Sequence, residues 1–392
     1  MRELSDAELV FLSLRFDLSD RATVSCFTDI VQLPFDWVQY QKRFIDERLE
    51  GYFLYNLKRV QLERCIPESV RFSFSSIAAE TVARNVSLTR SFGIVADCLN
   101  GAKIPFLCLK GAHLLGSVYR DYPLRRMSDI DVLIHPETLS AVERILCKEG
   151  FAVSAHDNPS VRHSRILAPV LREIMFERRD CKLDVHWGLA KPDGIAMMQE
   201  QRLWDKTGAL DLEGRVVSVL SAENLFLHLS THLFKNIMRK KMQLVMFCDI
   251  IDVIRYYADT FDWDYVCQAV REERLEPAVY SLLTCVHKEG FCTLPSSVQN
   301  AISPYRPFMI RQDGRCAHAA ASSEGAYYCG LLKGISGVRN KVFFLTSILF
   351  PTKKWLRIYH PGVRITSTAL LYLYHWKVSL GKGIQVMKEF FR

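Results

Sequence analysis

The chain has 392 residues, of which 49% are hydrophobic and 24% charged, and its formal net charge is +8. This balance is typical of globular proteins and excludes a disordered or fibrous chain, while the length predicts more than one domain. The longest clean apolar run, residues 342–350, is far shorter than the roughly 20 residues of a membrane-spanning helix, so we expect no transmembrane segment.

Cysteine usage indicates a reducing compartment. The twelve cysteines are scattered, and no two of them have the C-x-x-C spacing of a zinc or dithiol motif. The N-terminus opens into mixed polar sequence without the apolar stretch of a secretory signal. We therefore expect a cytoplasmic protein whose cysteines are small core residues.

Residues 1–100 are predicted to be helical. Leu88, Phe92, Val95 and Leu99 recur at spacings of three and four residues, which places them on one helix face. This stretch shows no catalytic pattern. We interpret it as an N-terminal helical region.

Residues 101–220 are predicted to form a small α/β core. Short apolar runs after chain breakers favour strands, and longer runs with one apolar face favour helices. The expected strands are residues 104–109, 129–134, 173–178, 182–187 and 216–220. A short helix is expected at residues 112–120, and another from Pro136, where a proline and an acid occupy the first turn.

Residues 221–392 are predicted to form a C-terminal helical domain with a basic tail. Residues 331–392 hold eleven Lys and Arg residues and a single acid, Glu389. Such a segment suits RNA or an anionic surface, and a solvated helical face is an equally good interpretation. The whole pattern predicts an α+β fold, a small mixed sheet flanked by N-terminal and C-terminal helical regions.

Two carboxylates mark the second expected strand of the core. Asp129 and Asp131 stand two residues apart, so on a strand they point to the same side, while Ile130 and Val132 point to the other. Two neighbouring like charges repel each other, and a divalent cation relieves this repulsion. The alternative is an exposed strand end with two solvated acids.

A third carboxylate lies on a later expected strand. Asp184 alternates with Leu183 and Val185, and it becomes a third metal ligand if this strand pairs near the first. Three carboxylates can hold two metal ions of the kind that assist phosphoryl transfer. His186 lies on the same face as Asp184. It either contacts the metal ligands without binding the metal itself, or packs as a core histidine.

Residues that suit a phosphate group surround these acids. Lys110 and Gly111 end the first expected strand, where the glycine lets a phosphate approach the backbone and the lysine supplies charge. Arg125, Arg126 and Ser128 lie in the loop before the acids and are candidates for contacts with phosphate or sugar. A plain turn and an ordinary surface loop are the alternatives.

The segment LKGAHLLGSVYRDYPLRRMSDIDVLI, followed by KLDVHW, resembles the bacterial uncharacterised nucleotidyltransferases of the DNA polymerase β superfamily. The resemblance extends from about residue 104 to residue 232. It implies that Asp129, Asp131 and Asp184 are the metal-binding acids. It also implies that Lys110-Gly111 is the glycine motif of the family.

The glycine motif departs from the common form of the superfamily. That form is Gly-Gly or Gly-Ser about a dozen residues before the D-x-D acids, whereas seventeen residues separate Gly111 from Asp129 here. A literal Gly-Ser pair occurs at Gly116 and Ser117. We favour Lys110-Gly111, because it follows an expected strand and the later pair falls within an expected helix.

Four residues of the helical domain are weaker candidates. His228 and His232 stand four apart on one helix face, as a metal pair would, but packing explains them better. Asp249 and Asp252 interrupt an apolar helix. Each either pairs with an arginine or faces an acceptor substrate.

We expect a metal-dependent nucleotidyltransferase, with Mg²⁺ or Mn²⁺, that transfers a nucleoside monophosphate from an NTP to an acceptor hydroxyl and releases pyrophosphate. One alternative is the same fold acting on a tRNA or a protein, which the basic tail suggests. Another is a catalytically degenerate nucleotide-binding or scaffold protein. The acceptor and the preferred nucleotide do not follow from the sequence.

Overall fold

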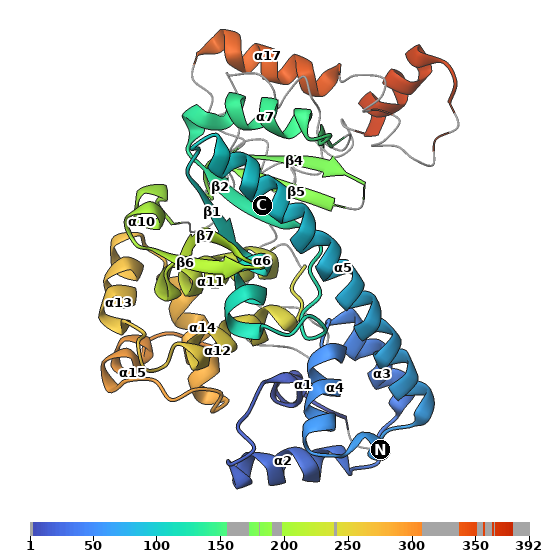
Figure 1. Ribbon diagram of the computed structural model, residues 1–392, viewed down its shortest axis with the longest axis vertical. Coiled ribbons are helices and arrows are strands. Elements are labelled where there is room, and N and C mark those ends of the chain that lie inside the picture. Colours follow the sequence, from blue (N-terminus) through green and yellow to red (C-terminus); the bar gives the residue numbers. More distant parts are fainter. Residues whose placement is uncertain are drawn as a thin grey trace. The chain divides into compact units, whose positions relative to one another are not determined.

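The computed structural model describes residues 3–154, 172–179, 181–189, 198–238, 241–307, 337–350, 356, 363 and 365–378. These residues form helices and one mixed sheet (Figure 1). The expected α+β class, with helical regions before and after the strands, is confirmed. No helix in the described part of the chain is long and apolar enough to cross a membrane.

The N-terminal region is helical, as expected. Its helices are α1 Asp6–Ser13, α2 Arg21–Val31, α3 Trp37–Asp46, α4 Glu50–Arg59 and the long α5 Glu68–Gly101 (Figure 1). The side chains of Ser5, Asp20 and Asp36 accept backbone N–H groups and so begin the first three helices. An aromatic cluster joins these helices, with Phe44 stacked on Phe53 at a centroid distance of 4.4 Å.

The sheet has the strand order β3-β4-β5-β2-β1-β7-β6 within the described residues. The strand β1 runs parallel to β7, whereas β3 with β4, β4 with β5 and β6 with β7 are antiparallel. The bounds are β1 Phe106–Leu109, β2 Ile130–Ile134, β3 Ala152–Val153, β4 Glu173–Arg178, β5 Cys181–His186, β6 Thr207–Leu212 and β7 Arg215–Leu220.

The five expected strands are present, with ends shifted by up to two residues. Every residue of β1 and β2 is buried, which explains why these strands read as unbroken apolar runs. The sequence missed β3 and β6. Four of the six residues of β6 are exposed, so it lacks an apolar pattern. It forms because Glu213 and Gly214, both at positive φ, make a tight turn onto β7.

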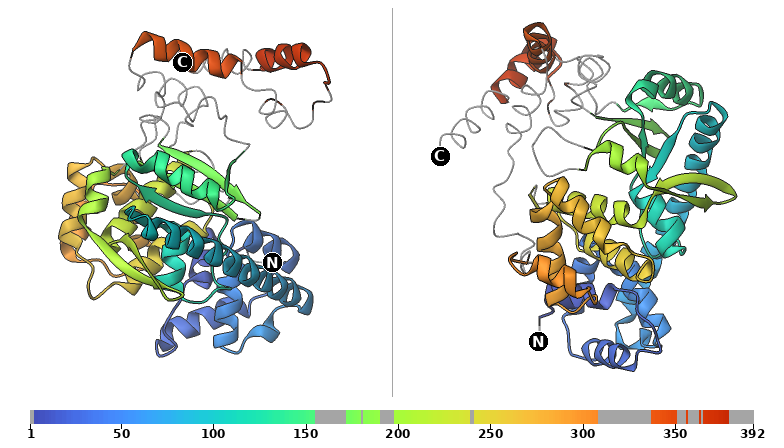
Figure 2. Two further views of the ribbon diagram at one scale, coloured as in Figure 1. Left: turned by 45° about the horizontal axis from the view of Figure 1, so that its top comes forward. Right: turned by 90° about the vertical axis from the view of Figure 1, so that its left-hand side faces the viewer.

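The residues after the sheet form further helices, as expected. They are α11 Ala222–Met238, α12 Val245–Tyr256, α13 Trp263–Glu272, α14 Glu276–Lys288, α15 Ser296–Ile302 and, later in the chain, α17 Val338–Leu349. Ser221 accepts the N–H of Asn224 through its hydroxyl, so it is the N-cap that was expected. The helices α12, α13 and α14 all pack against α11 (Figure 2).

Between β1 and β2 lie the helix α6 Lys110–Leu114, a π-helical turn over Leu115–Tyr119, and the loop that leads to Asp129. After β2 come a short 3₁₀ turn, Pro136–Thr138, and α7 Leu139–Lys148. The short helix α10 Glu200–Asp205 precedes β6.

The chain divides into two compact units. The first is drawn from Met1–Asp97, Leu107–Ile130 and Met198–Ala319, and the second from Cys98–Phe106, Asp131–Met197 and Ala320–Arg392. The division into three domains near residues 100 and 220 stays a prediction. Most of the basic tail, including residues 331–336, 351–355 and 379–392, lies outside the described residues, so its contact with RNA also stays a prediction.

No disulfide joins the cysteines in the described part of the chain. The expected core position is confirmed for the four that are buried: Cys108, Cys181, Cys248 and Cys285. It is wrong for three that are exposed: Cys26, Cys65 and Cys147. A thiol is small and only weakly polar, so it is tolerated in either setting.

Candidate metal centre

Two acids and a histidine meet in the second unit. Asp131 lies in β2 and is 3% exposed, while Asp184 and His186 lie two residues apart in β5 and so share a face. Each of the three offers one ligand atom, and these atoms all lie within 4.8 Å of one another. The strand pattern thus brings together Asp131 and Asp184, as expected, and adds His186 to them.

His186 is held between two carboxylates. Its Nε2 lies 2.9 Å from Oδ1 of Asp131, and its Nδ1 lies 3.6 Å from Oε2 of Glu173. Glu173 stands opposite His186 in the antiparallel register of β4 and β5. The ring is therefore fixed on both sides, and it orients the carboxylate of Asp131. These contacts favour a role for His186 beside the acids over that of a plain core histidine, and the role itself stays a prediction.

Glu173 was missed at the sequence level, although a signal for it existed. The sequence placed the turn between these two strands at Arg179-Asp180. An antiparallel hairpin that pairs Arg178 with Cys181 also pairs Glu173 with His186. Counting outward from the turn would have found this partner.

The donor set fits a divalent cation. Carboxylate oxygens suit Mg²⁺ and Mn²⁺, and imidazole nitrogen is a common ligand of transition metals. Asp131 is buried and Asp184 half-buried, and two carboxylates this close would repel each other strongly if both were ionised. A bound cation removes this repulsion and permits both to stay ionised. The identity of the metal does not follow from the geometry.

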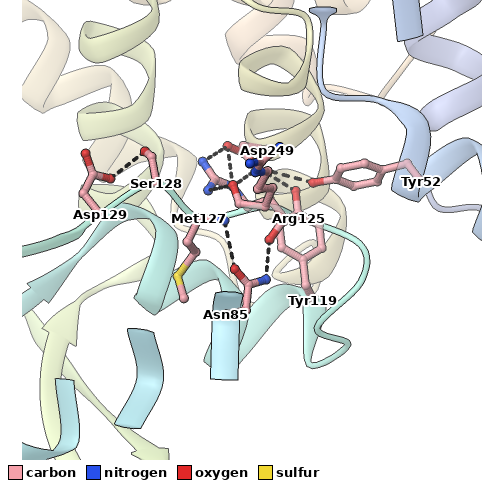
Figure 3. A network of polar contacts seen from close by, with 9 residues as sticks. Tyr52, Asn85, Tyr119, Arg125, Met127, Ser128, Asp129 and Asp249 are labelled. Atoms are coloured by element: carbon pink, nitrogen blue, oxygen red, sulfur yellow. Dashed lines mark hydrogen bonds and ion pairs between the residues drawn. The ribbon is translucent and has the colours of Figure 1, made fainter. Parts of the chain in front are cut away.

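Asp129 precedes β2 and is not part of the group that meets around His186. It belongs to the first unit, and its Oδ1 accepts a hydrogen bond of 2.9 Å from the hydroxyl of Ser128 (Figure 3). Its role as a metal ligand stays a prediction. The same holds for a contact between Ser128 and a nucleotide.

A buried ion pair anchors the loop before Asp129. Arg125 donates from Nε at 3.0 Å to Oδ1 of Asp249 and from a terminal nitrogen at 2.9 Å to Oδ2 (Figure 3). Tyr119 donates to the same carboxylate at 2.9 Å, and the hydroxyl of Tyr52 lies 3.5 Å from it. Arg125 is thus a structural residue whose charge is neutralised by Asp249, and it does not serve as the phosphate ligand considered from the sequence.

The pKa values in this network follow from burial and charge. Burial lowers the pKa of Arg125, but the neighbouring Asp249 carboxylate outweighs this effect and raises the pKa above its ordinary value. Burial raises the pKa of both Tyr52 and Tyr119, and the negative charge of Asp249 raises it further. The arginine therefore stays charged and the tyrosines stay neutral hydrogen-bond donors.

Helix α5 holds the backbone of the same loop. The side-chain amide of Asn85 donates at 2.8 Å to the carbonyls of Tyr122 and Arg125, and its oxygen accepts the N–H of Met127 at 3.0 Å. Arg84 donates at 2.7 Å to the carbonyls of Met127 and Ser128. These partners lie some forty residues from the loop in sequence, and no local pattern pointed to them.

Two glycines let other segments approach this loop closely. A Cβ on Gly111 would lie 3.2 Å from a guanidinium nitrogen of Arg125 and 3.3 Å from Met127. A Cβ on Gly51, in α4, would lie 2.4 Å from the carbonyl oxygen of Pro123, so no larger residue fits there without movement. The loop is therefore enclosed by α4, α5 and α6.

The start of α6 differs from the expected helix. The helix begins at Lys110, two residues earlier than predicted, and is followed after Leu114 by the π-helical turn. Lys110 has a φ of +41°, an uncommon value for a residue with a side chain. Such a conformation directly after β1 marks this position as a candidate functional site.

Gly116 and Ser117 serve packing. A Cβ on Gly116 would lie 2.3 Å from a methyl carbon of Leu212 and 2.7 Å from one of Leu210, so a larger residue there would require these leucine side chains to shift. Ser117 is buried and donates its hydroxyl to the carbonyl of His113 at 2.7 Å. This pair has a structural explanation, as Gly111 also has, so the choice of Lys110-Gly111 as the glycine motif stays a prediction.

Positive charge gathers near Arg126, which is exposed. Burial lowers the pKa of Arg48, and the positive charges of Arg125 and Arg126 lower it further, whereas Asp129 acts in the opposite direction. Arg48 therefore lies within electrostatic reach of the loop and of Asp129. The N-terminal helical region thus contributes a cation to this neighbourhood, which sequence reasoning missed.

The other candidates of the helical domain separate into two kinds. Asp249 pairs with an arginine, which was one of its two expected roles. His228 and His232 have ring centroids 6.4 Å apart and belong to no metal-binding group found among the described residues.

Within one mixed sheet, a buried Asp131, a half-buried Asp184 and a buried His186 meet on adjacent strands. This arrangement places the protein among those with a candidate metal centre. Comparison with protein families then gives the particular family. The family described as "Uncharacterised nucleotidyltransferase" matches residues 34–289, well over half of the chain, so the chain belongs to this family. A search of curated proteins finds no match.

Proposed function

We propose that the protein is a metal-dependent nucleotidyltransferase that transfers a nucleoside monophosphate from an NTP to an acceptor hydroxyl and releases pyrophosphate. Membership of a nucleotidyltransferase family supports the reaction class. The observation that carries the proposal is the meeting of Asp131, Asp184 and His186 within 4.8 Å. Phosphoryl transfer requires that the reacting groups are positioned and that the charge on the phosphate is neutralised. A metal bound at this centre would serve both needs.

Asp131 and Asp184 hold the metal in this proposal, and His186 keeps Asp131 oriented through its 2.9 Å contact. Asp129, two residues before Asp131 in the chain, supplies the third carboxylate. Bound Mg²⁺ or Mn²⁺ would polarise the phosphate and neutralise developing charge. Asp184 accepts the proton of the attacking hydroxyl.

The triphosphate is bound by cations and backbone near the loop. Lys110 supplies charge, and Gly111, which is buried, adds no side chain beside it. Arg126 is exposed and free of the ion pair that occupies Arg125, so it contacts phosphate, with Arg48 adding positive potential. Ser128 contacts the sugar or a phosphate oxygen through its hydroxyl.

The basic tail favours a macromolecular acceptor as a second candidate. Eleven cationic residues against one acid in residues 331–392 suit a tRNA or an acidic protein. Since one fold serves many acceptors, the fold does not decide between these and a small molecule. Placement in the polymerase β superfamily, a bacterial source and a cytoplasmic location stay predictions.

The reaction type is tested with an NTP labelled at either the α- or the γ-phosphate, incubated with the protein, Mg²⁺ and an extract that contains candidate acceptors. We expect transfer of the α label alone, and its loss in Asp184→Asn. Asp259→Asn, an exposed acid outside the centre, is the matched control and should keep the transfer. Transfer of the γ label would show a kinase-type reaction and overturn the proposal.

A further inference from the structure

A cavity separate from the candidate metal centre lies in the first unit. Its lining comes from α1, α2, α4 and α12 and from the segments that adjoin α1 and α14. Its volume is about 680 Å³, within the range of about 300–1,000 Å³ that small-molecule sites occupy. None of the acids and cations proposed above for nucleotide transfer lines it. Its polar lining includes Arg15, Arg59, Arg255 and Asp252.

The three arginines are held in place by backbone carbonyls. Arg15 donates to the carbonyl of Val118 at 2.6 Å, Arg59 to that of Phe16 at 2.7 Å, and Arg255 to that of Arg15 at 2.8 Å. Within the described residues, none of the three forms an ion pair with a carboxylate. Each guanidinium has five N–H donors, so Arg15 and Arg59 keep donors for a ligand, and all three keep their charge.

Aromatic rings line the same cavity. The guanidinium of Arg59 lies 5.3 Å from the ring centroid of Tyr55 and 5.8 Å from that of Phe16. These contacts orient the guanidinium further. The cavity therefore presents a fixed cationic and aromatic wall.

Asp252 is a buried acidic residue in the lining of the cavity. It is 3% exposed, and its Oδ2 has no hydrogen-bond partner among the described residues. A buried carboxyl oxygen without a partner destabilises the folded state, so such an atom calls for an explanation. A ligand that donates a hydrogen bond to Oδ2 would provide it.

The other acids of the lining, Asp17, Asp20 and Glu289, are exposed. Asp17 accepts the N–H of Ser19, and Asp20 accepts the N–H and the hydroxyl of Thr23 at the start of α2. Asp252 is thus the buried acid of the lining, which it shares with the three arginines. A ligand with only negative charge would be repelled by Asp252, and one with only positive charge would be repelled by the arginines.

We propose that this cavity binds a small zwitterion, a molecule that carries a protonated amine together with a carboxylate or phosphate group. The amine donates to Oδ2 of Asp252. The anionic group accepts from the unused N–H donors of Arg15 and Arg59 and is drawn by the charge of Arg255. The site is separate from the nucleotide site and does not depend on the proposed reaction.

The test uses the purified full chain and probes of defined charge. Binding is measured by calorimetry and by the rise in unfolding temperature with β-alanine, γ-aminobutyrate and phosphoethanolamine. Acetate, inorganic phosphate and ethylamine carry one charge type each and serve as matched controls. We expect concentration-dependent binding of at least one zwitterion and none of the controls. Binding of β-alanine or γ-aminobutyrate would indicate that the ligand carries a carboxylate, and binding of phosphoethanolamine would indicate that it carries a phosphate.

Variants connect binding to the cavity. Asp252→Asn keeps the shape of the side chain, and we expect about tenfold weaker binding or more, because a charge-assisted hydrogen bond is lost. Arg59→Gln, also in the lining of the cavity, is expected to weaken binding similarly. Asp29→Asn, exposed on α2 and outside the cavity, should bind as the wild type does. Absence of binding to every zwitterion, or equal binding by wild type and both cavity variants, would overturn the proposal.

Discussion

Asp249 accepts hydrogen bonds from Arg125 and Tyr119 while only 2% exposed, and this pairing accounts for the stability of the loop before Asp129. In Asp249→Ala, a buried guanidinium loses its counter-charge. We expect a loss of about 3–5 kcal/mol in the free energy of unfolding, measured by urea denaturation. The exposed pair of Arg215 with Asp97 is the control, and Asp97→Ala should cost about 0–1 kcal/mol. Similar losses in both variants would contradict the structural role of Arg125.

His186 is expected to affect metal binding more than folding. Its ring orients the carboxylate of Asp131, and loss of such a partner typically weakens metal binding about 10–100-fold. The prediction for His186→Ala is that much weaker Mn²⁺ binding, measured by calorimetry. His287→Ala, in an exposed position on α14, is the control and should bind normally. Unchanged Mn²⁺ affinity in His186→Ala would show that the histidine only packs.

The pKa of Asp252 predicts a pH dependence of stability. Burial raises this pKa from its ordinary value of 3.8 to about 7, with Arg255 and Arg15 acting in the opposite direction. Between these two values the folded state binds more protons than the unfolded state, so stability falls as the pH rises. As the pH rises from 4 to 7, the wild type should therefore lose stability relative to Asp252→Asn, because asparagine does not titrate. The measurement is the free energy of unfolding of both proteins at each pH. A difference independent of pH would contradict the raised pKa.

At the scale of elements, α5 positions the loop through Asn85. Asn85→Ala removes three hydrogen bonds and leaves buried backbone groups of the loop without partners. We expect a loss of about 2–4 kcal/mol in the free energy of unfolding, measured by urea denaturation. Ser87→Ala, exposed on the same helix, should change stability by less than about 0.5 kcal/mol. An equally small effect of Asn85→Ala would show that the loop is held by other means.

The elements differ in how far the sequence reveals them. The buried strands β1 and β2 are unbroken apolar runs, and the hairpin of β4 and β5 carries a visible turn, so all four could be predicted. The strand β6 is mostly exposed and depends on its pairing with β7, which no local pattern shows. The two acids that meet, Asp131 and Asp184, followed from strand alternation.

The partner of Arg125 could not be predicted in the same way. Its charge suggested phosphate binding, but Asp249 lies 124 positions later in the chain and reaches it only through folding. Arg84 and Asn85 are likewise remote from the loop that they hold. A pattern within one segment does not show which distant side chain will neutralise a charge, and burial decides between a structural and a functional arginine.

At the scale of the whole molecule, charge is unevenly distributed along the chain. The net charge is +8, yet residues 331–392 alone hold eleven cationic residues and one acid. If this region binds RNA, affinity for a tRNA should fall steeply with salt, and a chain lacking residues 331–392 should lose both the affinity and the salt dependence. Fluorescence anisotropy measures both. Equal binding by the two chains would favour a solvated helical face.

The central claim is that Asp131 and Asp184 form a metal centre that serves a nucleotide. The most direct measurement is the unfolding temperature of the purified protein with each NTP, with and without Mg²⁺ or Mn²⁺, beside Asp131→Asn and Asp184→Asn. A ligand that binds only the folded state raises its apparent stability. We predict a rise that needs both nucleotide and metal and disappears in both variants. A rise that persists in the variants, or no rise with any NTP, would contradict the account.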